Sequence, residues 1–280
     1  MKLFKNLLRD TLEQETAFLT ILLSFSTIKI VLITNRNRGK QMEKKVLVVT
    51  GGFHTYGILE LLDKENKIKD TLENIKDIKE ISEIIVVDDG SSDNTSKIAK
   101  EVKSDKITVI TQDKNRGKGY ALNNGLKIAM EKADIIGFLD ADLGSSSSEV
   151  SKLITPILND EADVIIAKFP PAKKKGGLGF VKGLAKESVY EMTGVKLDAT
   201  LSGQRIFKKE VLEKFNEIPF GYGVEVGMTI DILKHGYRIK EVLVNMTHSE
   251  TGRDLKGFIH RGKQYYHIKK VLRQKKKEWR

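Results

Sequence analysis

The sequence predicts an α/β fold in which a mostly parallel central sheet is covered by helices on both faces. From Lys44 onward, short apolar runs alternate with segments whose apolar residues recur at helical spacing, the pattern of strands joined by crossover helices. Two of these runs end in acidic pairs, and ligands of parallel sheets bind beyond the carboxyl ends of the strands. The acidic ends therefore mark the expected site.

The first elements are a strand in "KKVLVV" and a helix in "KENKIKDTLENIKDIKE". The helix is predicted from Ile68, Leu72, Ile75 and Ile78, which form one apolar stripe. A buried strand follows in "EIIVVDDG", and then a helix in "SDNTSKIAKEV", where serine or aspartate is available as the N-cap.

The alternation continues with a strand in "KITVITQ", a helix in "GYALNNGLKIAMEK" and strands in "ADIIGFLDAD" and "ADVIIAKF". Four serines follow the acids of "LDAD", and we expect them to cap a helix that starts near Glu149. The segment "KKKGGLG", residues 173–179, is predicted to be a flexible loop.

Three regions are expected along the chain. Residues 1–43 form an apolar and basic extension, residues 44–260 the α/β domain, and residues 261–280 a basic helix or tail with nine Lys or Arg and one acid. Residues 17–34 are long enough to span a bilayer, but Lys29 lies among them, at a cost of roughly 2.5–3.5 kcal/mol. An amphipathic surface helix and a leader packed on the domain are the alternatives.

Composition limits the function classes. The chain of 280 residues has no cysteine, which excludes disulfides, thiolate zinc sites and cysteine nucleophiles and fits a cytoplasmic protein. The formal charge of +11 favours polyanionic partners. Only 7% of residues are aromatic, and no basic stretch has the interleaved aromatics of a nucleic-acid site, so we expect no nucleic-acid partner.

Acidic pairs define two candidate motifs, and a glycine-rich segment defines a third. "VVDDGSSDNT" combines acids at a strand end with glycine and helix-capping residues, a rim that can accept hydrogen bonds from a base or ribose. In "NRGKGYALNNG", two glycines flank a lysine ahead of a helix, where phosphate or sugar could bind. An ordinary turn and a solvated lysine are the structural alternatives.

The pair Asp140 and Asp142 is the second acidic motif. A strand would place both carboxylates on one side, about 7 Å apart, with Ala141 pointing away. Two hard oxygen ligands beside a polar loop suit Mg²⁺ or Mn²⁺ bridged to a diphosphate.

In order, "VVDDGSSDNT", "NRGKGYALNNG" and "FLDADLG" resemble the nucleotide-sugar-binding half of family-2-type glycosyltransferases, which have the Rossmann-like GT-A fold. Downstream, "LSGQRIFKKEVL" is similar to a motif of polyprenyl-phosphate sugar transferases. "GYGVEVGMTIDIL" and the following "NMTHSETGRDLKGFIHRGKQ" resemble the corresponding part of glucosyl-3-phosphoglycerate synthases.

The resemblance implies roles for individual residues. Those expected at the donor are Asp88 and Asp89 beside the nucleoside, then Gly90, Ser91, Arg116, Lys118, Asp140 near the ribose, Ala141 and Asp142.

Two further groups follow from the same resemblance. Asp142 would bind the metal with help from His248. Gln204, Arg205 and Glu225 would be the catalytic group that faces the sugar or acceptor, with Glu225 as the base for an acceptor hydroxyl. A structural ion pair between Glu225 and Arg205 is the alternative.

The start of the domain departs from the family pattern. Such enzymes usually begin with a strand that ends in a Pro-x-x-Asn-Glu-like motif, whereas Asp63 and Lys64 stand where Asn and Glu are expected. Either "TYGILELL" replaces the first strand, or "KKVLVV" serves as that strand and a segment has been inserted after it.

The expected activity is metal-dependent transfer of a sugar from a nucleoside-diphosphate sugar, with a UDP-sugar as the favoured donor. The acceptor is expected to be phosphorylated, either polyprenyl phosphate or a small phospho-acid such as 3-phosphoglycerate. The basic tail and apolar N-terminal run favour peripheral contact with an anionic membrane, at its cytoplasmic face. A nucleotidyltransferase and a nucleotide-binding protein with a degenerate transferase site are the alternatives.

Overall fold

The computed structural model describes residues 37–38, 41–42, 45–51, 58–91, 93–116, 118–170, 180–215, 223–246 and 255–279. Side chains are described from residue 67 onward, except those of residues 118, 255–261 and 263. The apolar run 17–34 and the loop 173–179 lie outside the described residues. Among the helices that are described, none combines the length and the apolar character needed to cross a bilayer.

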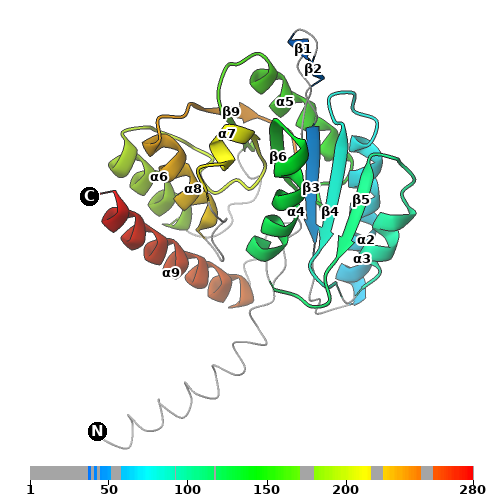
Figure 1. The fold of residues 1–280 in the computed structure, drawn as a ribbon. Coiled ribbons are helices and arrows are strands. Elements are labelled where there is room, and N and C mark those ends of the chain that lie inside the picture. The colour runs from blue at the N-terminus through cyan, green and yellow to red at the C-terminus, as the bar shows by residue number, and fades with distance from the viewer. Residues whose placement is uncertain are drawn as a thin grey trace, which may run out of the picture.

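A seven-stranded sheet forms the centre of the molecule, in the order β5-β4-β3-β6-β8-β7-β9 (Figure 1). Strand β8 runs antiparallel to its neighbours β6 and β7, and every other neighbouring pair is parallel. The strands are β3 (Lys45–Gly51), β4 (Glu83–Asp88), β5 (Ile107–Thr111), β6 (Ile135–Asp140), β7 (Val164–Lys168), β8 (Arg205–Lys208) and β9 (Ile239–Leu243), and a separate two-stranded sheet joins β1 (Asn37–Arg38) to β2 (Gln41–Met42).

Strand β3 resolves the question of how the domain begins. It is built from "KVLVVTG" and lies between β4 and β6, so it is the strand from which the parallel part of the sheet extends. Helix α2 (Ile58–Ile75) already includes "ILELL". The "KKVLVV" segment is therefore the first strand of the sheet, as one of the two alternatives had it.

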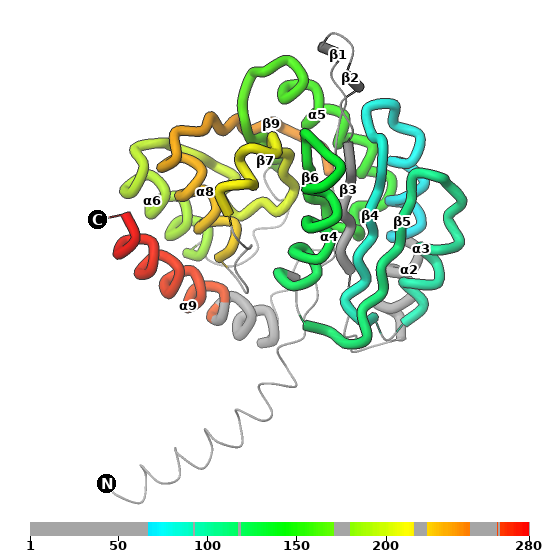
Figure 2. The backbone as a smooth tube through the Cα atoms, in the orientation of Figure 1, coloured from blue at the N-terminus to red at the C-terminus, as the bar shows by residue number. Residues whose placement is uncertain are grey.

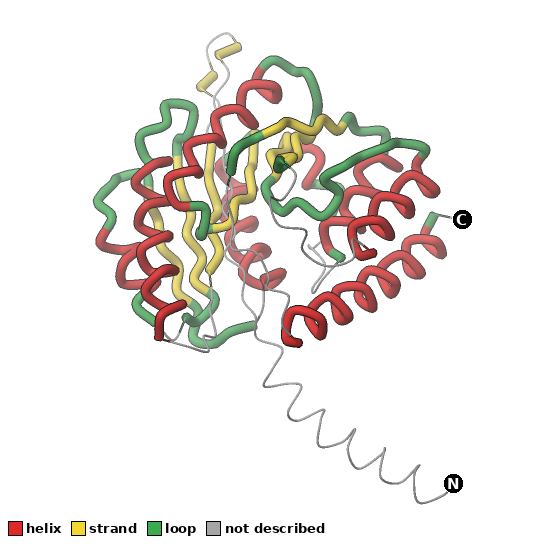
Figure 3. The backbone as a smooth tube through the Cα atoms, turned by 180° about the vertical axis from the view of Figure 1, so that it is seen from behind, coloured by secondary structure: helices red, strands yellow, loops and turns green. Residues whose placement is uncertain are grey.

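Helices cover both faces of the sheet. Helix α4 lies on one face, over β3 and β4, and α2, α3 and α5 lie on the other face (Figures 1 and 3). Helices α6, α8 and α9 form a group beside the sheet, at the side away from β5 (Figure 2). Their bounds, with those of the short helices, are α3 (Thr95–Glu101), α4 (Lys118–Lys132), η1 (a 3₁₀ helix, Gly144–Val150), α5 (Ser151–Leu158), α6 (Phe180–Thr193), α7 (Lys209–Leu212), α8 (Val224–Lys234) and α9 (Leu255–Glu278).

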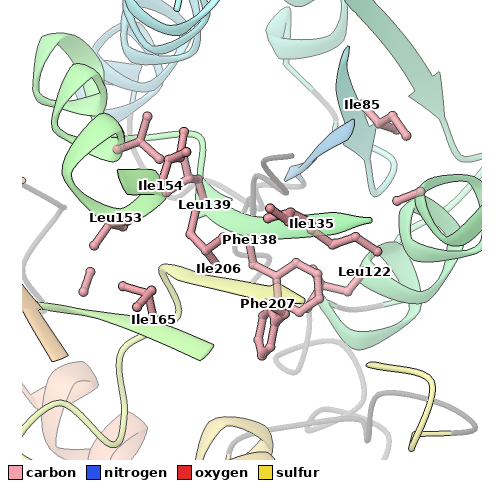
Figure 4. Packing of buried hydrophobic residues seen from close by; sticks show 14 of the residues in the cluster. Ile85, Leu122, Ile135, Phe138, Leu139, Leu153, Ile154, Ile165, Ile206 and Phe207 are labelled. Carbon is pink, nitrogen blue, oxygen red and sulfur yellow. The ribbon is translucent and has the colours of Figure 1, made fainter. Parts of the chain in front are cut away.

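The main core lies between the sheet and its covering helices (Figure 4). Ile68, Leu72 and Ile75 of α2 are fully buried, which confirms three residues of the predicted apolar stripe. The fourth, Ile78, lies beyond the end of α2 and is partly buried against the core. On the sheet, the rings of Phe138 and Phe207 pack with centroids 5.0 Å apart and join β6 to the antiparallel strand β8. Burial of apolar surface of this kind supplies most of the folding free energy.

At the amino end of β7, opposite the acidic strand ends, an ion-pair network fixes the sheet. The carboxylate of Asp163 accepts hydrogen bonds from the Arg238 guanidinium and the Lys208 ammonium. Burial acts to raise the pKa of Asp163, but these hydrogen bonds outweigh burial and hold the pKa well below its usual range. The charged side chains at the amino end of β7 therefore stabilise the sheet.

Helix α9 contains most of the predicted basic tail, although it begins at Leu255 rather than near residue 261. Ile268 and Leu272 are buried in a second apolar cluster with α6 and α8. Asp231 of α8 anchors the last turns, because its carboxylate accepts hydrogen bonds from Lys275 Nζ (2.7 Å) and Trp279 Nε1 (2.9 Å). The helix is thus a fixed part of the fold.

Gly227 of α8 lies under α9, where a Cβ would come within 2.9 Å of Val271 Cγ1. We expect Gly227→Leu to lower the free energy of unfolding by about 2 kcal/mol, because overpacking forces the two helices apart. Urea unfolding measures the change. The matched control is Gly183→Leu in α6, where a Cβ meets no atom within 4 Å; it should leave stability unchanged or raise it slightly. Equal effects of the two substitutions would contradict close packing at Gly227.

Candidate active site

The two acidic strand ends meet on either side of β3. Asp88, the last residue of β4, is in register with Gly51, and Asp140, the last residue of β6, is in register with Thr50. Because β3 lies between β4 and β6, residues about fifty positions apart in the sequence lie at the same edge of the sheet. This is the edge at which ligands of parallel sheets bind.

One carboxylate oxygen of Asp88 accepts hydrogen bonds, and the other has no partner in the described structure. Its Oδ1 accepts hydrogen bonds from the Ser91 backbone N–H (3.0 Å) and the Ser91 hydroxyl (2.5 Å). Its Oδ2 is buried and has no hydrogen-bond partner among the described residues. An orphaned buried acceptor is costly, so a ligand that donates an N–H or O–H group is expected there.

The turn after Asp88 is fixed to the loop that precedes α4. Asp89 Oδ1 accepts a hydrogen bond from the Arg116 backbone N–H (2.9 Å). Gly90 has φ +74°, and a Cβ at this position would lie 2.8 Å from the Asn115 backbone nitrogen. Both the left-handed conformation and the close contact require glycine. Two predicted donor-binding motifs therefore form one rim.

The two basic residues of the rim are placed differently. The Arg116 guanidinium is exposed, lies 4.7 Å above the ring of Tyr120 and donates a hydrogen bond to its hydroxyl (2.6 Å). Lys118 is the first residue of α4, and its side chain lies outside the described part of the chain. Arg116 is thus held near the rim by stacking on Tyr120.

Strand β6 ends at Asp140, so Ala141 and Asp142 lie in a turn. The expectation that a strand carries both acids is therefore wrong, because the strand ends two residues before Asp142. Ala141, which was expected at the donor, is fully buried. Asp140 Oδ2 accepts a hydrogen bond from Gln204 Nε2 (2.5 Å), and Oδ1 is buried without a partner in the described structure. Asp142 is partly exposed beside it.

Thr71 of α2, which none of the sequence motifs includes, holds this turn in place. Its hydroxyl is fully buried and shares its proton between two carbonyl oxygens, that of Ala141 (2.8 Å) and that of Lys67 in the preceding turn of α2. The hydroxyl oxygen accepts a hydrogen bond from the Gly144 backbone N–H (2.8 Å). The Ser147 hydroxyl donates to the Thr71 carbonyl oxygen (3.1 Å). A threonine next to Leu72 on the buried stripe was the signal that could have identified it.

The four serines do not cap a helix that starts near Glu149. They form most of the 3₁₀ helix η1, and α5 begins at Ser151. No side-chain cap is made at either helix within the described residues. The serine hydroxyls instead bond to nearby carbonyl oxygens, Ser146 to Leu143 and Ser148 to Ser145, because serine competes for local backbone groups.

Arg205, at the start of β8, is 2% exposed, and its guanidinium is bonded to the protein. It donates to the carbonyl oxygens of Ser202 (2.8 Å) and Thr200 (3.0 Å) and to the Thr229 hydroxyl (3.0 Å). Burial lowers the pKa of Arg205 to about 10, although the negative charges of Glu225 and Glu241 oppose the shift. This placement favours the alternative in which Arg205 has a structural role.

Glu225 lies in the first turn of α8 and is partly exposed. Its backbone oxygen accepts a hydrogen bond from the same Thr229 hydroxyl that Arg205 contacts. The Glu225 carboxylate is close enough for its negative charge to act against the lowering of the Arg205 pKa. Part of the Glu225 side chain remains exposed to solvent. Gln204, the residue before Arg205, is buried and reaches Asp140 instead.

The donor set for a metal ion is incomplete in the described residues. No group of three or more histidine or acidic side chains that could hold a metal gathers in the part of the chain that the structure describes, and His248 lies outside it. The carboxylate of Asp142, partly exposed in the turn beyond β6, is nevertheless a hard oxygen ligand, which fits a cation that prefers oxygen and takes its other ligands from a diphosphate.

Comparisons with known proteins agree with this arrangement. The model for glycosyl transferase family 2 matches residues 60–236. An uncharacterized protein of Methanocaldococcus jannaschii is 32% identical over 208 residues, 69% of this chain and 81% of that protein. The UDP-N-acetylglucosamine–dolichyl-phosphate N-acetylglucosaminyltransferase of Methanococcus voltae is 30% identical over 187 residues, 58% of this chain and 72% of that enzyme.

Among solved structures, a glucosyl-3-phosphoglycerate synthase from Mycobacterium tuberculosis, in complex with Mn²⁺, UDP and phosphoglyceric acid, has a TM-score of 0.62. It is 22% identical, and the match covers 86% of this chain and 84% of that one. The structural likeness confirms the predicted α/β GT-A fold. The family model and the sequence relatives show that the chain belongs to glycosyl transferase family 2 and is a glycosyltransferase.

Proposed function

We propose that this glycosyltransferase moves a sugar from a UDP-sugar to a polyprenyl phosphate, in a reaction that needs Mg²⁺ or Mn²⁺. The observation that carries the proposal is the pair of buried, unpartnered carboxylate oxygens, Asp88 Oδ2 and Asp140 Oδ1, on either side of β3 in the described structure. Membership of the family removes the support for the nucleotidyltransferase alternative.

The nucleotide would bind across the end of β3. Asp88 Oδ2 is suited to accept an N–H of the base, and Asp140 Oδ1 a ribose hydroxyl, because each is an acceptor already withdrawn from water. Gln204 holds Asp140 through its other oxygen. Gly90 and Ser91 shape the turn beneath the base, and the relative from Methanococcus voltae uses a UDP-sugar by its name.

The diphosphate would lie next to Asp142. Asp142 and His248 are the proposed metal ligands, and a bound divalent cation would stabilise the negative charge that grows on the departing diphosphate. Arg116 would supply further positive charge from the rim, and Lys118, at the start of α4, is proposed to do the same. Thr71 holds the turn that carries Asp142, because its hydroxyl is hydrogen-bonded to the Ala141 carbonyl oxygen and to the Gly144 N–H.

The acceptor would approach from α8, where Glu225 lies partly exposed. A phosphate acceptor is already ionised and needs no base, so Glu225 would position the acceptor or sugar, and Arg205 would fix the supporting loop. Polyprenyl phosphate is favoured because the name of the Methanococcus voltae relative specifies dolichyl phosphate. We propose that the reaction takes place at the cytoplasmic face of a membrane.

A small phosphorylated acid is the second candidate acceptor. The structural neighbour from Mycobacterium tuberculosis is named for 3-phosphoglycerate and was solved with phosphoglyceric acid. Its overall fold matches most of the present chain, which is the specific observation in favour of this acceptor.

Asp142→Ala is expected to abolish Mn²⁺-dependent release of UDP from a UDP-sugar, by at least about 100-fold, because the metal loses a protein ligand. UDP release with a panel of donors measures it. Asp77→Ala, an exposed acid beyond α2, is the control and should retain full activity. Sugar transfer by Asp142→Ala at the normal rate, in a protein with an unchanged circular dichroism spectrum, would refute the metal assignment.

Thr71→Val should weaken Mn²⁺ binding several-fold and lower the free energy of unfolding by about 1–3 kcal/mol. The isosteric side chain leaves the Gly144 N–H and the Ala141 carbonyl without their partner. The increase in melting temperature on addition of Mn²⁺ and UDP reports binding. Thr71→Ser keeps the hydroxyl and should restore the increase; if both variants respond to Mn²⁺ as the unsubstituted protein does, the hydroxyl does not position Asp142.

The acceptor is tested by offering a short-chain polyprenyl phosphate and 3-phosphoglycerate in parallel, with UDP-glucose and UDP-N-acetylglucosamine as donors. We expect a glycolipid product that chromatography separates from the free donor. A product formed on 3-phosphoglycerate alone would replace the lipid acceptor by the soluble one.

A further inference from the structure

Helix α9 has two faces of different character. At 3.6 residues per turn, Ile268, Leu272 and Trp279 lie on one side, and this side packs on α6 and α8. In the described part of the helix, Lys275 is the one cation on this side, and it forms an ion pair with Asp231 of α8. The apolar side of the helix is thus fully used within the fold.

The opposite side of α9 is basic and exposed. It carries Tyr266, which is 66% exposed, and five exposed cations, which we call the basic face: Lys269, Lys270, Arg273, Lys276 and Lys277. Over the described part of α9 the one acid is Glu278, and it pairs with Lys275.

Most cations of the basic face have no counter-charge among the described residues. Lys276 lies 3.6 Å from Glu191, in a pair of which both side chains are half exposed, a contact worth little in water. Lys269 lies over the ring of Tyr265. For Lys270, Arg273 and Lys277, no ion pair is found in the part of the chain that the structure covers. The basic face therefore concentrates positive charge on an exposed surface, and its cations contribute little to holding the described part of the fold together.

A rigid basic helix with an exposed tyrosine has the chemistry of a membrane-surface contact. Clusters of four to eight Lys or Arg on a helix match the charge of anionic lipid headgroups, and tyrosine favours the boundary between headgroups and water. A nucleic acid is less well matched, because binding of a strand would call for several aromatic side chains interleaved with the cations, and Tyr266 is the single strongly exposed aromatic on the described part of this face.

The buried side of α9, opposite the basic face, packs against the start of α8. Gly223, which precedes the first turn of α8, packs against α9 so closely that a Cβ at position 223 would lie 3.2 Å from the Ile268 Cα. Glu225 lies in that first turn. In Figure 1, β3 and β4 run downward, so their acidic ends face the lower side of the view, along which α9 lies. A membrane that α9 contacts from below in this view would thus lie on the side toward which these strand ends point.

We propose that the basic face of α9 docks this protein on an anionic membrane surface and so presents the acceptor end of the site to lipid. The orientation toward the acceptor rests on the proposed function, whereas the docking itself can be measured without turnover. Each cation contributes about five-fold to partitioning onto an anionic bilayer. Salt screens such contacts strongly.

The test uses the full chain and sedimentation with vesicles of phosphatidylcholine that contain about 30% phosphatidylglycerol. The test variant is K270Q/R273Q/K277Q. Its matched control is K97Q/K100Q/K103Q, which removes the same charge from exposed positions on and after α3, at the opposite side of the molecule (Figures 1 and 3). None of these six residues is placed in the site.

We expect the α9 variant to lose about 100-fold in partitioning and the α3 variant to stay close to the unsubstituted protein. Binding should vanish on neutral phosphatidylcholine vesicles and weaken as salt rises. Equal losses in both variants would reduce the effect to net charge and overturn the proposal. Undiminished binding of the α9 variant, or preference for an RNA oligomer over vesicles, would also overturn it.

A second measurement separates this proposal from the transferase proposal. With a water-soluble short-chain polyprenyl phosphate, the α9 variant should transfer sugar at the normal rate, and with a long-chain acceptor in anionic vesicles its rate should fall. If vesicle binding depends on α9 while no acceptor is used, docking stands and the proposed acceptor fails. If the long-chain rate is unchanged in the variant, docking has no part in acceptor access.

Discussion

The buried guanidinium of Arg205 is the contact on which the acceptor side of the molecule depends. Removing a cation from water is costly unless its donors are satisfied, and Arg205 satisfies them with two carbonyl oxygens of the loop 200–202 and the hydroxyl of Thr229. The arginine thereby ties this loop to α8. Helix α8 in turn packs against α6 and α9, so the buried arginine links this loop to the group of three helices beside the sheet.

The donor side is ordered by a different constraint, the position of β3 between β4 and β6. Strand register alone brings Asp88 and Asp140 to the same level. The two sides meet in the hydrogen bond from Gln204 to Asp140, since Gln204 immediately precedes Arg205 in the chain. A site built on strand ends and linked in this way needs little rearrangement to hold a nucleotide, which lowers the cost of binding.

The parts of the fold that could be predicted from the sequence were those with a clear hydrophobic pattern. Strands β4, β6 and β7 are apolar and buried, and the α2 stripe has helical spacing. Strands β8 and β9 were not predicted, because β8 is four residues long and begins with arginine, and the apolar residues of β9 are interrupted by Lys240 and Glu241. The serines of η1 have no hydrophobic period.

The same division holds for the site. The motif residues were located because their order resembles a known family, and the structure places the acids at one edge of the sheet. The role of Thr71 arises from a contact across seventy residues of sequence, and the burial of Arg205 depends on packing by α8. Such long-range contacts leave no periodic pattern in the sequence, so pattern analysis does not detect them.

The contact of Gly90 with the backbone at Asn115 has a consequence for protein engineering. The separation is so small that the two loops cannot be altered independently: a side chain at position 90 would collide with the backbone of the other loop. A change of donor preference by loop exchange should therefore transplant residues 88–91 and 114–116 as one matched pair. A library that varies the first loop alone should keep glycine at position 90, because any side chain there would meet the backbone at Lys114 and Asn115.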